Sequence, residues 1–431
     1  MLHRCGHDDR NDAAESSAMS EGALRDRSPT PMRRTKRSVM GFAADAASEA
    51  VLEDALRDLV QAELTRSGVE VSHEIKRGTL KSAIAAMMRA PAPDILIVDI
   101  GADAAPGRLL AALSEVIEPS VALFVLGEVD DIGLYRLITR DIGAVDYLFK
   151  PLTRETVARY FGPLISQDIQ AVESSRGGRV IALTGARGGV GASTIAAMLA
   201  LYLGETSNRH TLLLDADPFI GISHGLCGGA PGEALGALLS GESAIDAAAL
   251  DAAIQPVRGR LSLLALPPDL NRQFVPKDGA AKALIAALRQ RFNFIIVDLP
   301  FLPLQSHREL LEAVHHRVIV LDPSIAGLRD TLRLLALPKG PTQPQRPTIM
   351  LNHANIKGGF DRRRLEDALK RKVDIAMPDL PKRFQPVAKL ADLMLSPRDP
   401  AFRAVAELAR EAGFESGRGA LRADPLAVQA A

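Results

Sequence analysis

The stretch that decides the fold is Val180-Ile-Ala-Leu-Thr-Gly-Ala-Arg-Gly-Gly-Val-Gly-Ala-Ser-Thr194. It opens with a short, mostly apolar run, which predicts a buried strand, and it leads into a segment that is typical of a helix. Glycines between a strand and the N-terminus of a helix let backbone N–H groups approach an anion where a Cβ would collide. The stretch therefore predicts a phosphate-binding loop.

Two positions of this loop depart from the common pattern. Ala192 stands where a Lys normally reaches the β- and γ-phosphates, and Ala186 replaces a frequent glycine. The missing ammonium removes positive charge from the place where charge develops in phosphoryl transfer, so we expect weakened nucleotide binding. Arg187, which precedes the glycine pair, restores one cation that can clamp phosphate oxygens. Ser193 lies where such loops place the hydroxyl that ligates Mg²⁺.

Two later apolar segments end in carboxylates. Leu212-Leu-Leu-Asp215 is followed by Asp217, and Phe294-Ile-Ile-Val-Asp298 ends in a third acidic residue. The carboxyl ends of parallel strands meet at one edge of a sheet, where ligands bind in open α/β folds. We therefore expect Asp298 to hold Mg²⁺ beside the loop. The alternative for each carboxylate is that it caps the helix that follows.

Segments of strand length alternate with segments of helix length through most of the chain. This alternation implies right-handed crossovers, parallel sheets and an α/β fold class. The expected strands are residues 39–44, 69–75, 95–98, 121–126, 144–149, 180–184, 211–214, 261–265, 294–297, 317–321 and 348–351.

The composition of the connecting segments divides the chain into five parts. We expect residues 1–38 to form a disordered leader and residues 39–165 to form a first domain. Residues 166–178 are polar and then Gly-rich, which is typical of a linker. We expect residues 179–415 to form a second domain and residues 416–431 to form a flexible tail.

The order of motifs in the second domain resembles that of the ParA/MinD-type deviant P-loop ATPases. The resemblance covers nearly all of residues 179–415. It implies a P-loop parallel-sheet domain of the SIMIBI class, ATP and Mg²⁺ as cofactors, and a homodimer that forms on nucleotide binding. The matching motifs are Arg187 to Thr194, Asp215-x-Asp217-Pro218, Asp298-Leu-Pro300, Val318 to Asp330 and Met350-Leu-Asn352-His.

The same resemblance implies roles for single residues. Arg187 holds the position of the basic residue that reaches across the dimer. The carboxylate that positions the attacking water would be Asp215 or Asp217. Asn352 would contact adenine, although the sequence also fits a role in a buried turn. The residues that would bind the nucleotide are Arg187, Gly188, Gly189, Val190, Gly191, Ala192, Ser193, Thr194 and Asn352.

The first domain contains Ile95-Leu-Ile-Val-Asp99 and Gly143-Ala-Val-Asp-Tyr-Leu-Phe-Lys150-Pro151. With these segments it resembles a response-regulator receiver, which is a flavodoxin-like fold. In that family an Asp at the end of the third strand accepts a phosphoryl group and a Lys before Pro contacts it, positions held here by Asp99 and Lys150. The acidic pair that holds Mg²⁺ is reduced to Asp45, and the fourth strand ends in Gly127 where Ser or Thr is usual. We therefore expect an unphosphorylated module in which Asp99 pairs with Lys150. Phosphorylation of Asp99 is the alternative.

A degenerate receiver followed by a deviant P-loop domain resembles the CpaE/TadZ family of Flp-type (Tad) pilus assembly proteins. This resemblance implies an ATP-binding positioning factor with weak or no hydrolysis, with pilus or secretion assembly proteins as partners. It also implies a cytoplasmic protein that is recruited to the cell pole or to inner-membrane pilus machinery. The alternatives are an active ParA/MinD-type ATPase for positioning or partition, and a regulator that responds to phosphorylation.

Composition narrows the class of protein. A chain of 431 residues is too long for one ordinary core, and 47% hydrophobic with 24% charged residues excludes wholesale disorder. Basic and acidic residues number 52 each, so the net charge is zero and we do not expect DNA binding. The basic segment 361–372 is the one candidate for such binding, and a solvated helix face is the simpler interpretation.

The remaining features predict an intracellular protein without a metal cluster. Cys5 and Cys227 cannot form a disulfide framework. No uninterrupted apolar run reaches the roughly 18 residues of a membrane span, and the charged first twenty residues do not fit a signal peptide. His307, His315 and His316 lack a metal-ligand spacing, and we expect them at the surface or at helix ends.

Overall fold

The computed structural model describes residues 36–68, 70–103, 106–166, 177–341, 343, 346–381, 393 and 396–413. Two α/β regions lie within these residues, and each is built on a sheet of its own. The predictions for the leader up to residue 35, for residues 167–176 of the linker and for the 416–431 tail lie outside the described residues. Within the described chain, no helix has both the length and the apolar character needed to span a membrane.

The first region, residues 36–166, contains a five-stranded sheet in the order β2-β1-β3-β4-β5. All neighbouring strands are parallel, and the order is that of flavodoxin-like doubly wound folds. The elements of this region are β1 (Lys36–Ala43), α1 (Ala46–Ser67), β2 (Glu70–Arg77), α2 (Leu80–Met87), β3 (Ile95–Asp99), α3 (Gly107–Val116), β4 (Ala122–Gly127), α4 (Ile132–Arg136), the π-helical turn η1 (Leu137–Asp141), β5 (Asp146–Phe149) and α5 (Arg154–Ser166).

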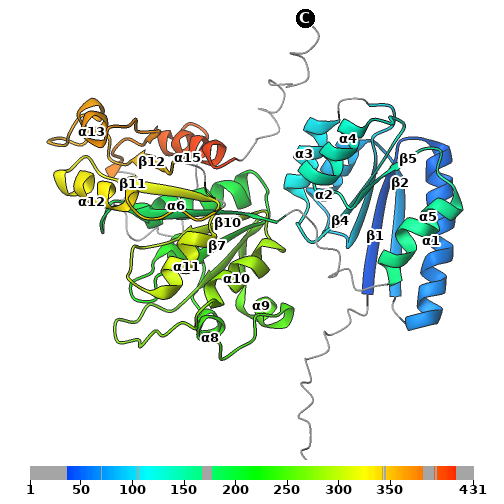
Figure 1. Ribbon diagram of the computed structural model, residues 1–431, viewed down its shortest axis with the longest axis horizontal. Helices are drawn as coiled ribbons and strands as arrows, with labels where there is room; N and C mark the ends of the chain where they lie inside the picture. The colour runs from blue at the N-terminus through cyan, green and yellow to red at the C-terminus, as the bar shows by residue number, and fades with distance from the viewer. Residues whose placement is uncertain are drawn as a thin grey trace, which may run out of the picture. The chain divides into compact units, whose positions relative to one another are not determined.

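Helices cover both faces of this sheet (Figure 1). The α2, α3 and α4 helices pack on one face, and α1 and α5 pack on the other. Every residue of β3 and β4 is buried, which explains why these strands are continuous apolar runs in the sequence. The first strand begins at Lys36, inside the segment predicted as leader, because its pairing with β2 extends to Lys36 opposite Glu70.

The second region, residues 177–413, contains an eight-stranded sheet in the order β13-β12-β11-β6-β10-β7-β9-β8. Its elements are β6 (Arg179–Gly185), α6 (Ala192–Leu201), the π-helical turn η3 (Tyr202–Thr206), β7 (Thr211–Asp215), α7 (Ser223–Leu226), α8 (Ala234–Ser240), α9 (Ala247–Ala253), β8 (Gln255–Arg258), β9 (Leu261–Ala265), α10 (Ala280–Arg289), β10 (Phe294–Asp298), α11 (Gln305–Ala313), β11 (His316–Leu321), α12 (Ile325–Leu335), β12 (Thr348–Leu351), α13 (Arg362–Leu369), β13 (Ile375–Ala376) and α15 (Pro400–Glu411).

Neighbouring strands of this sheet are parallel, except that β8 runs antiparallel to β9. The six strands predicted for the second region are all present. The sequence does not predict β8 and β13. The first lies at the edge of the sheet, contains Pro256 and is largely exposed, so it has no apolar run, and the second has two residues. The β6 strand lies in the middle of the sheet, between β11 and β10.

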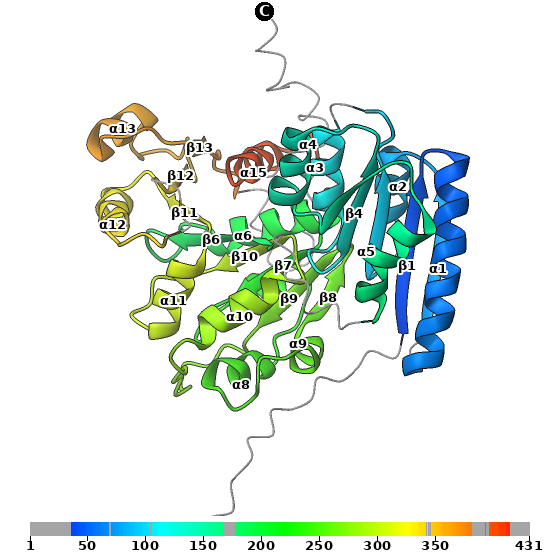
Figure 2. The same ribbon diagram turned by 45° about the vertical axis from the view of Figure 1, so that its right-hand side comes forward.

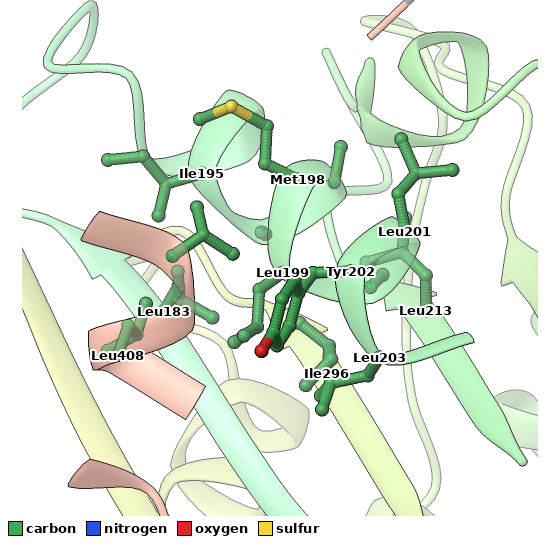
Figure 3. Packing of buried hydrophobic residues seen from close by; sticks show 14 of the residues in the cluster. Leu183, Ile195, Met198, Leu199, Leu201, Tyr202, Leu203, Leu213, Ile296 and Leu408 are labelled. Atoms are coloured by element: carbon green, nitrogen blue, oxygen red, sulfur yellow. The ribbon is translucent and has the colours of Figure 1, made fainter. Parts of the chain in front are cut away.

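The α6 helix, which follows the glycine loop, is buried along most of its length. Its residues 195–201 are each at most 4% exposed. Figure 3 shows its side chains packed with Leu183, Leu213 and Ile296 of the strands and with Leu408 of α15. The α10 and α11 helices cover the other face of the sheet (Figure 2). Packing on several sides therefore holds the N-terminus of α6 in place beside the loop.

Candidate functional site

The loop between β6 and α6 has a backbone shape that depends on glycine. Gly189 and Gly191 have φ angles of +82° and +89°, which other residues rarely adopt. A Cβ on Gly191 would lie 2.5 Å from Asn352 Nδ2, so this position also lacks space for a side chain. A Cβ on Gly188 or Gly189 would meet no atom within 4 Å. That side of the loop therefore faces open space, where a ligand can approach the backbone.

The N-terminus of α6 has no side-chain cap. The N–H groups of its first turn therefore lack side-chain acceptors, and the helix dipole adds positive potential at the same place. Ser193 and Thr194 lie half-buried in this turn, and Ala192 packs against the core. The arrangement fits an anion, although the lysine that usually contacts such an anion is replaced.

Arg187 and Val190 lie in the loop with opposite exposures. The Arg187 side chain is exposed and forms no ion pair within the described chain. Val190 is buried, and its carbonyl oxygen accepts a hydrogen bond from Asn352 Nδ2 at 2.9 Å. Arg187 is therefore available to a ligand or a second molecule, whereas Val190 helps to fix the loop.

Asn352 follows β12 and is buried against the loop. Besides the bond from its Nδ2 to Val190, its Oδ1 accepts the His353 N–H at 2.9 Å. Both ends of the amide are thus engaged within the chain, which is the turn role that the sequence left open. Contact with a base stays a prediction.

Asp215 and Asp298 lie side by side at the carboxyl edge of the sheet. They are opposite each other in the pairing of β7 with β10, and both are buried. Asp217 is also buried, but its Oδ1 accepts the N–H groups of Phe219 and Ile220 at 2.9 and 3.0 Å. The structure therefore gives Asp217 a turn-capping role and brings Asp215 and Asp298 together.

The environment of Asp298 disfavours its charged form. Burial raises the pKa of this carboxyl to about 7, and the charge of Asp215 acts in the same direction. The hydroxyls of Ser193 and Ser223 oppose the rise. Ser223 Oγ has no hydrogen bond of good geometry, so the Ser193 hydroxyl is the main group that opposes the rise. Asp298 therefore sits where a proton or a metal cation stabilises it.

His224 and Ser223 are residues of this site that the sequence did not single out. His224 Nδ1 lies 3.2 Å from Asp215 Oδ2, and the Ser223 N–H donates to the same oxygen at 3.1 Å. Neither residue is part of a recognisable spacing, because α7 has only four residues and returns to Asp215 through a turn. Only the folded chain reveals this contact.

The carboxylates do not form a ready-made metal cluster. In the part of the chain that the structure describes, no group of three or more His, Cys, Asp or Glu side chains is arranged to hold a metal ion. Magnesium in nucleotide sites usually keeps several waters and takes few protein ligands, with substrate phosphates completing its shell. Ser193 and Asp298 fit such a partial set, because the Ser193 hydroxyl is near enough to lower the Asp298 pKa.

In the first region, the Asp99 carboxylate forms an ion pair with a lysine of the same chain. Lys150 Nζ lies 2.5 Å from Asp99 Oδ2 and 2.6 Å from Asp45 Oδ2, as the sequence predicted for the Asp99 pair. Asp99 also accepts the backbone N–H groups of Ala44 at 2.9 Å and Gly101 at 2.8 Å. The carboxylate is buried, and both of its oxygens are engaged.

The pKa shifts in this cluster have the signs of a stable ion pair. The hydrogen bond from Lys150 holds the pKa of Asp45 well below its usual range, with the Ser48 N–H adding to the effect. Burial would lower the pKa of Lys150, but its hydrogen bonds to Asp45 and Asp99 outweigh burial and leave the pKa raised. Lys150 therefore stays charged and forms ion pairs with both the Asp45 and the Asp99 carboxylates.

Gly127 ends β4 where a receiver has Ser or Thr. A Cβ on Gly127 would lie 2.5 Å from the hydroxyl oxygen of Tyr147, which donates to the Val129 carbonyl oxygen at 2.9 Å. The buried Tyr147 ring thus fills the space that a Ser or Thr side chain would need.

The prediction that three histidines lie at the surface or at helix ends holds for His307 only in its second form, because His307 lies in the first turn of α11 but is not at the surface. His307 is 5% exposed because it lies one turn before the buried Leu310 on α11, and burial lowers its pKa to about 4. His315 and His316 are half-buried. His315 Nδ1 accepts the Val180 N–H at 3.1 Å, and His316 Nε2 lies 2.8 Å from Thr348 Oγ1.

Comparison with known proteins shows the family to which the chain belongs. No family model matches the chain. It is 33% identical over 177 residues to the chromosome-partitioning ATPase Soj of Thermus thermophilus, a match that covers 37% of this chain and 68% of that protein. The chain belongs to the ParA/MinD-type ATPase family.

Solved structures resemble parts of this ParA/MinD-type ATPase chain. A ParA family ATPase from Chlorobium tepidum is 23% identical, with 55% of this chain and 99% of that chain covered and a TM-score of 0.49. The pilus assembly protein CpaE from Caulobacter crescentus is 28% identical, with 30% of this chain and 98% of that chain covered and a TM-score of 0.26. The family membership agrees with the motifs at Arg187, Asp215 and Asp298.

Proposed function

We propose that the chain is an ATP-binding positioning and assembly factor that dimerises when ATP and Mg²⁺ bind and that hydrolyses ATP slowly or not at all. The observation that carries the proposal is the pair of buried carboxylates, Asp215 and Asp298, beside an uncapped helix N-terminus. No Lys or Arg of the described chain pairs with either carboxylate. A Mg²⁺–triphosphate complex brings positive charge to the carboxylates and negative charge to the helix.

The residues divide the work of binding between backbone and side chains. The backbone of residues 187–194 would hold the phosphates, Ser193 and Asp298 would hold Mg²⁺, and Asp215 or Asp217 would position water. Because Ala192 has no ammonium to place on the transferred phosphoryl group, we expect hydrolysis to be slow. Bound Mg²⁺ would supply the charge neutralisation that phosphoryl transfer requires.

Exposed apolar side chains support a dimer through the same edge of the sheet. Ile220, Ile222, Phe301 and Ile325 follow β7, β10 and β11, and each is between 56% and 72% exposed. Large apolar side chains gathered around a ligand site are typical of an interaction surface. We propose a second copy of the chain as the partner, with Arg187 of each copy directed to the nucleotide of the other.

The finer part of the proposal is that the factor serves a Flp-type (Tad) pilus or type II-like secretion machine. It is supported by the order of the two regions and by the first region itself, where Lys150 already neutralises Asp99. Such a region suits protein contact better than phosphorylation. Assembly proteins as partners, a cytoplasmic location, and recruitment to the cell pole or to inner-membrane machinery belong to the same proposal.

The basic α13 helix does not favour DNA as a partner. Arg362 pairs with Glu366 at 2.8 Å, Arg364 lies 3.5 Å from Asp361, and the neighbouring Arg371 lies 3.6 Å from Asp374. Acidic side chains of the same chain thus form ion pairs with three of these arginines, as expected for a solvated helix face.

Sedimentation velocity of the full chain tests the proposal. We expect a shift from monomer to dimer on addition of ATP with Mg²⁺, and no shift with Mg²⁺ alone. Arg187→Ala should bind ATP but dimerise less, because its side chain is exposed and forms no ion pair within the described chain. An unchanged sedimentation coefficient at millimolar ATP would contradict the proposed nucleotide-dependent dimer.

An active ParA/MinD-type ATPase is the second candidate, and the exposed Arg187 side chain favours it. A guanidinium supplied by the loop could replace the missing lysine in the transition state. Steady phosphate release that disappears in Arg187→Ala would support this candidate. Phosphate release that stays at the buffer background would support the slow or inactive form.

A further inference from the structure

The carboxylate of Asp215 is enclosed by the turn of residues 216–222 that follows it. Its Oδ1 accepts the Asp217 N–H at 3.3 Å, and its Oδ2 accepts the Ser223 N–H at 3.1 Å. A Cβ on Gly221 would lie 2.6 Å from Oδ1, so the 216–222 turn passes directly over the carboxylate. Asp215 therefore ties both ends of the 216–222 turn to β7.

His224 adds a side-chain contact to the same carboxylate. Its Nδ1 lies 3.2 Å from Asp215 Oδ2, and its side chain is 13% exposed. An ionised carboxylate can only accept, so Nδ1 carries the hydrogen of this bond. Within the described residues, His224 is the one basic side chain that pairs with Asp215, Asp217 or Asp298.

The contacts of His224 bear on ligand binding because Asp215 is the neighbour of Asp298 across β7 and β10. A Mg²⁺–nucleotide complex at Asp298 brings a cation and its waters beside Asp215, where those waters seek carboxylate oxygens as acceptors. Within the chain, His224 and Ser223 already use Oδ2. Water or ligand and His224 therefore contend for one buried oxygen.

We propose that His224 is a positioning residue that latches the 216–222 turn onto Asp215 in the nucleotide-free chain, and that Mg²⁺–nucleotide competes with this latch. The inference rests on the proposed nucleotide site. Release of the latch frees the 216–222 turn, which carries the exposed Ile220 and Ile222, to meet a second copy of the chain. The latch thus couples the charge of the site to the shape of the dimer surface.

Competition predicts the direction of a mutation. His224→Leu should bind ATP with Mg²⁺ about three- to tenfold more tightly than the wild type, because a charge-assisted hydrogen bond no longer has to be broken. Backbone amides of the 216–222 turn should exchange hydrogen faster in nucleotide-free His224→Leu. His224→Asn keeps a donor near the position of Nδ1 and should stay close to the wild type in both measurements.

The tightening separates a latch from ordinary structural damage, which would weaken binding. His73→Leu is the matched control, because it removes a histidine–carboxylate pair, His73 Nε2 to Glu53 Oε1 at 3.4 Å, from the first region. Weaker or unchanged ATP binding by His224→Leu, or unchanged exchange of the 216–222 turn, overturns the proposal. Failure of the wild type to bind ATP overturns the proposed function instead, and the exchange measurement on nucleotide-free protein then still decides whether His224 holds the turn.

Discussion

In each of the two α/β regions a buried strand ends in the same three residues, Ile-Val-Asp. The two final aspartates differ in whether a basic side chain of the described chain pairs with them. β3 ends in Ile-Val-Asp99 and β10 ends in Ile-Val-Asp298. Asp99 lies 2.5 Å from Lys150 Nζ, whereas no Lys or Arg of the described chain pairs with Asp298. The comparison teaches that an aspartate at the end of a strand does not define a site. The side chain that reaches it from another loop decides its chemistry.

This difference in pairing decides whether each aspartate needs a cation from outside the chain. In the first region the ammonium of Lys150 neutralises Asp99 from within, so a further cation has little to gain there. In the second region burial and the charge of Asp215 raise the pKa of Asp298 to about 7, so this carboxyl favours a proton or a metal. The first site is therefore closed by its own chain, and the second stays open to a cation from outside the described chain.

Removal of the internal cation should have the largest effect on stability. Lys150→Met leaves the buried Asp99 carboxylate uncompensated, and we expect the free energy of unfolding of the first region to fall by about 3–5 kcal/mol. Urea denaturation of the full chain measures this loss. Lys81→Met, which changes an exposed lysine of α2 in the same region, is the control and should change little. A loss no larger than in the control would mean that Lys150 does not stabilise Asp99.

Asp298 should make the stability of the second region depend on pH. Its folded pKa of about 7 lies above the unfolded value of 3.8, so the native state keeps a proton that the unfolded chain has lost. The free energy of unfolding should therefore fall as pH rises through this window, by up to about 4 kcal/mol, and level off above it.

The variant Asp298→Asn lacks this titration and should lose that pH slope. Asp278→Asn, at an exposed carboxyl, should keep it. The measurement is urea denaturation at several pH values in nucleotide-free buffer. A wild-type profile that is as flat as that of Asp298→Asn would show that Asp298 is charged in the free chain. It would then contradict the raised pKa of Asp298, on which the contrast with Asp99 depends.

Gly191→Ala should weaken ligand binding at the loop beside Asp298 and leave the Asp99–Lys150 pair unchanged. The substitution places a Cβ 2.5 Å from Asn352 Nδ2 at a φ of +89°, which costs about 1–3 kcal/mol. ATP affinity should fall at least about tenfold, because the backbone N–H groups of the loop are displaced. Gly232→Ala adds a Cβ in open space and serves as the control. Equal ATP affinities of the two variants would exclude the loop as the phosphate site.

Arg187→Ala should have the smallest effect on the isolated chain. The side chain is exposed and forms no ion pair within the described residues, so the free energy of unfolding should change by less than about 0.5 kcal/mol. Its effect should be confined to the ATP-dependent dimer, as measured by sedimentation. A destabilised monomer would place Arg187 in the fold and not in the interface.

Sequence patterns predicted the parts of the fold that depend on buried strands and glycines. The apolar runs of β3, β4, β6 and β10 predicted the central parallel strands of both sheets, because strands that are covered on both faces are apolar along most of their length. The edge strand β8 could not be predicted in this way, because its exposed residues do not form an apolar run.

Part of the site was predictable for the same reason, and part was not. Asp215 and Asp298 follow apolar strands, so their meeting at one edge of the sheet follows from strand order. The contact of His224 with Asp215 depends on how the 216–222 turn returns to β7, and the place of Tyr147 over Gly127 depends on packing. No spacing in the sequence encodes either contact.

Isothermal titration calorimetry with ATP tests the central claim, that the loop of residues 185–194 binds a triphosphate with Mg²⁺ although Ala192 replaces the lysine. We predict binding to the wild-type chain that saturates below millimolar ATP with Mg²⁺ and weakens strongly when EDTA removes the metal. The absence of any binding heat at millimolar ATP with Mg²⁺, from protein that is folded by circular dichroism, would contradict the account.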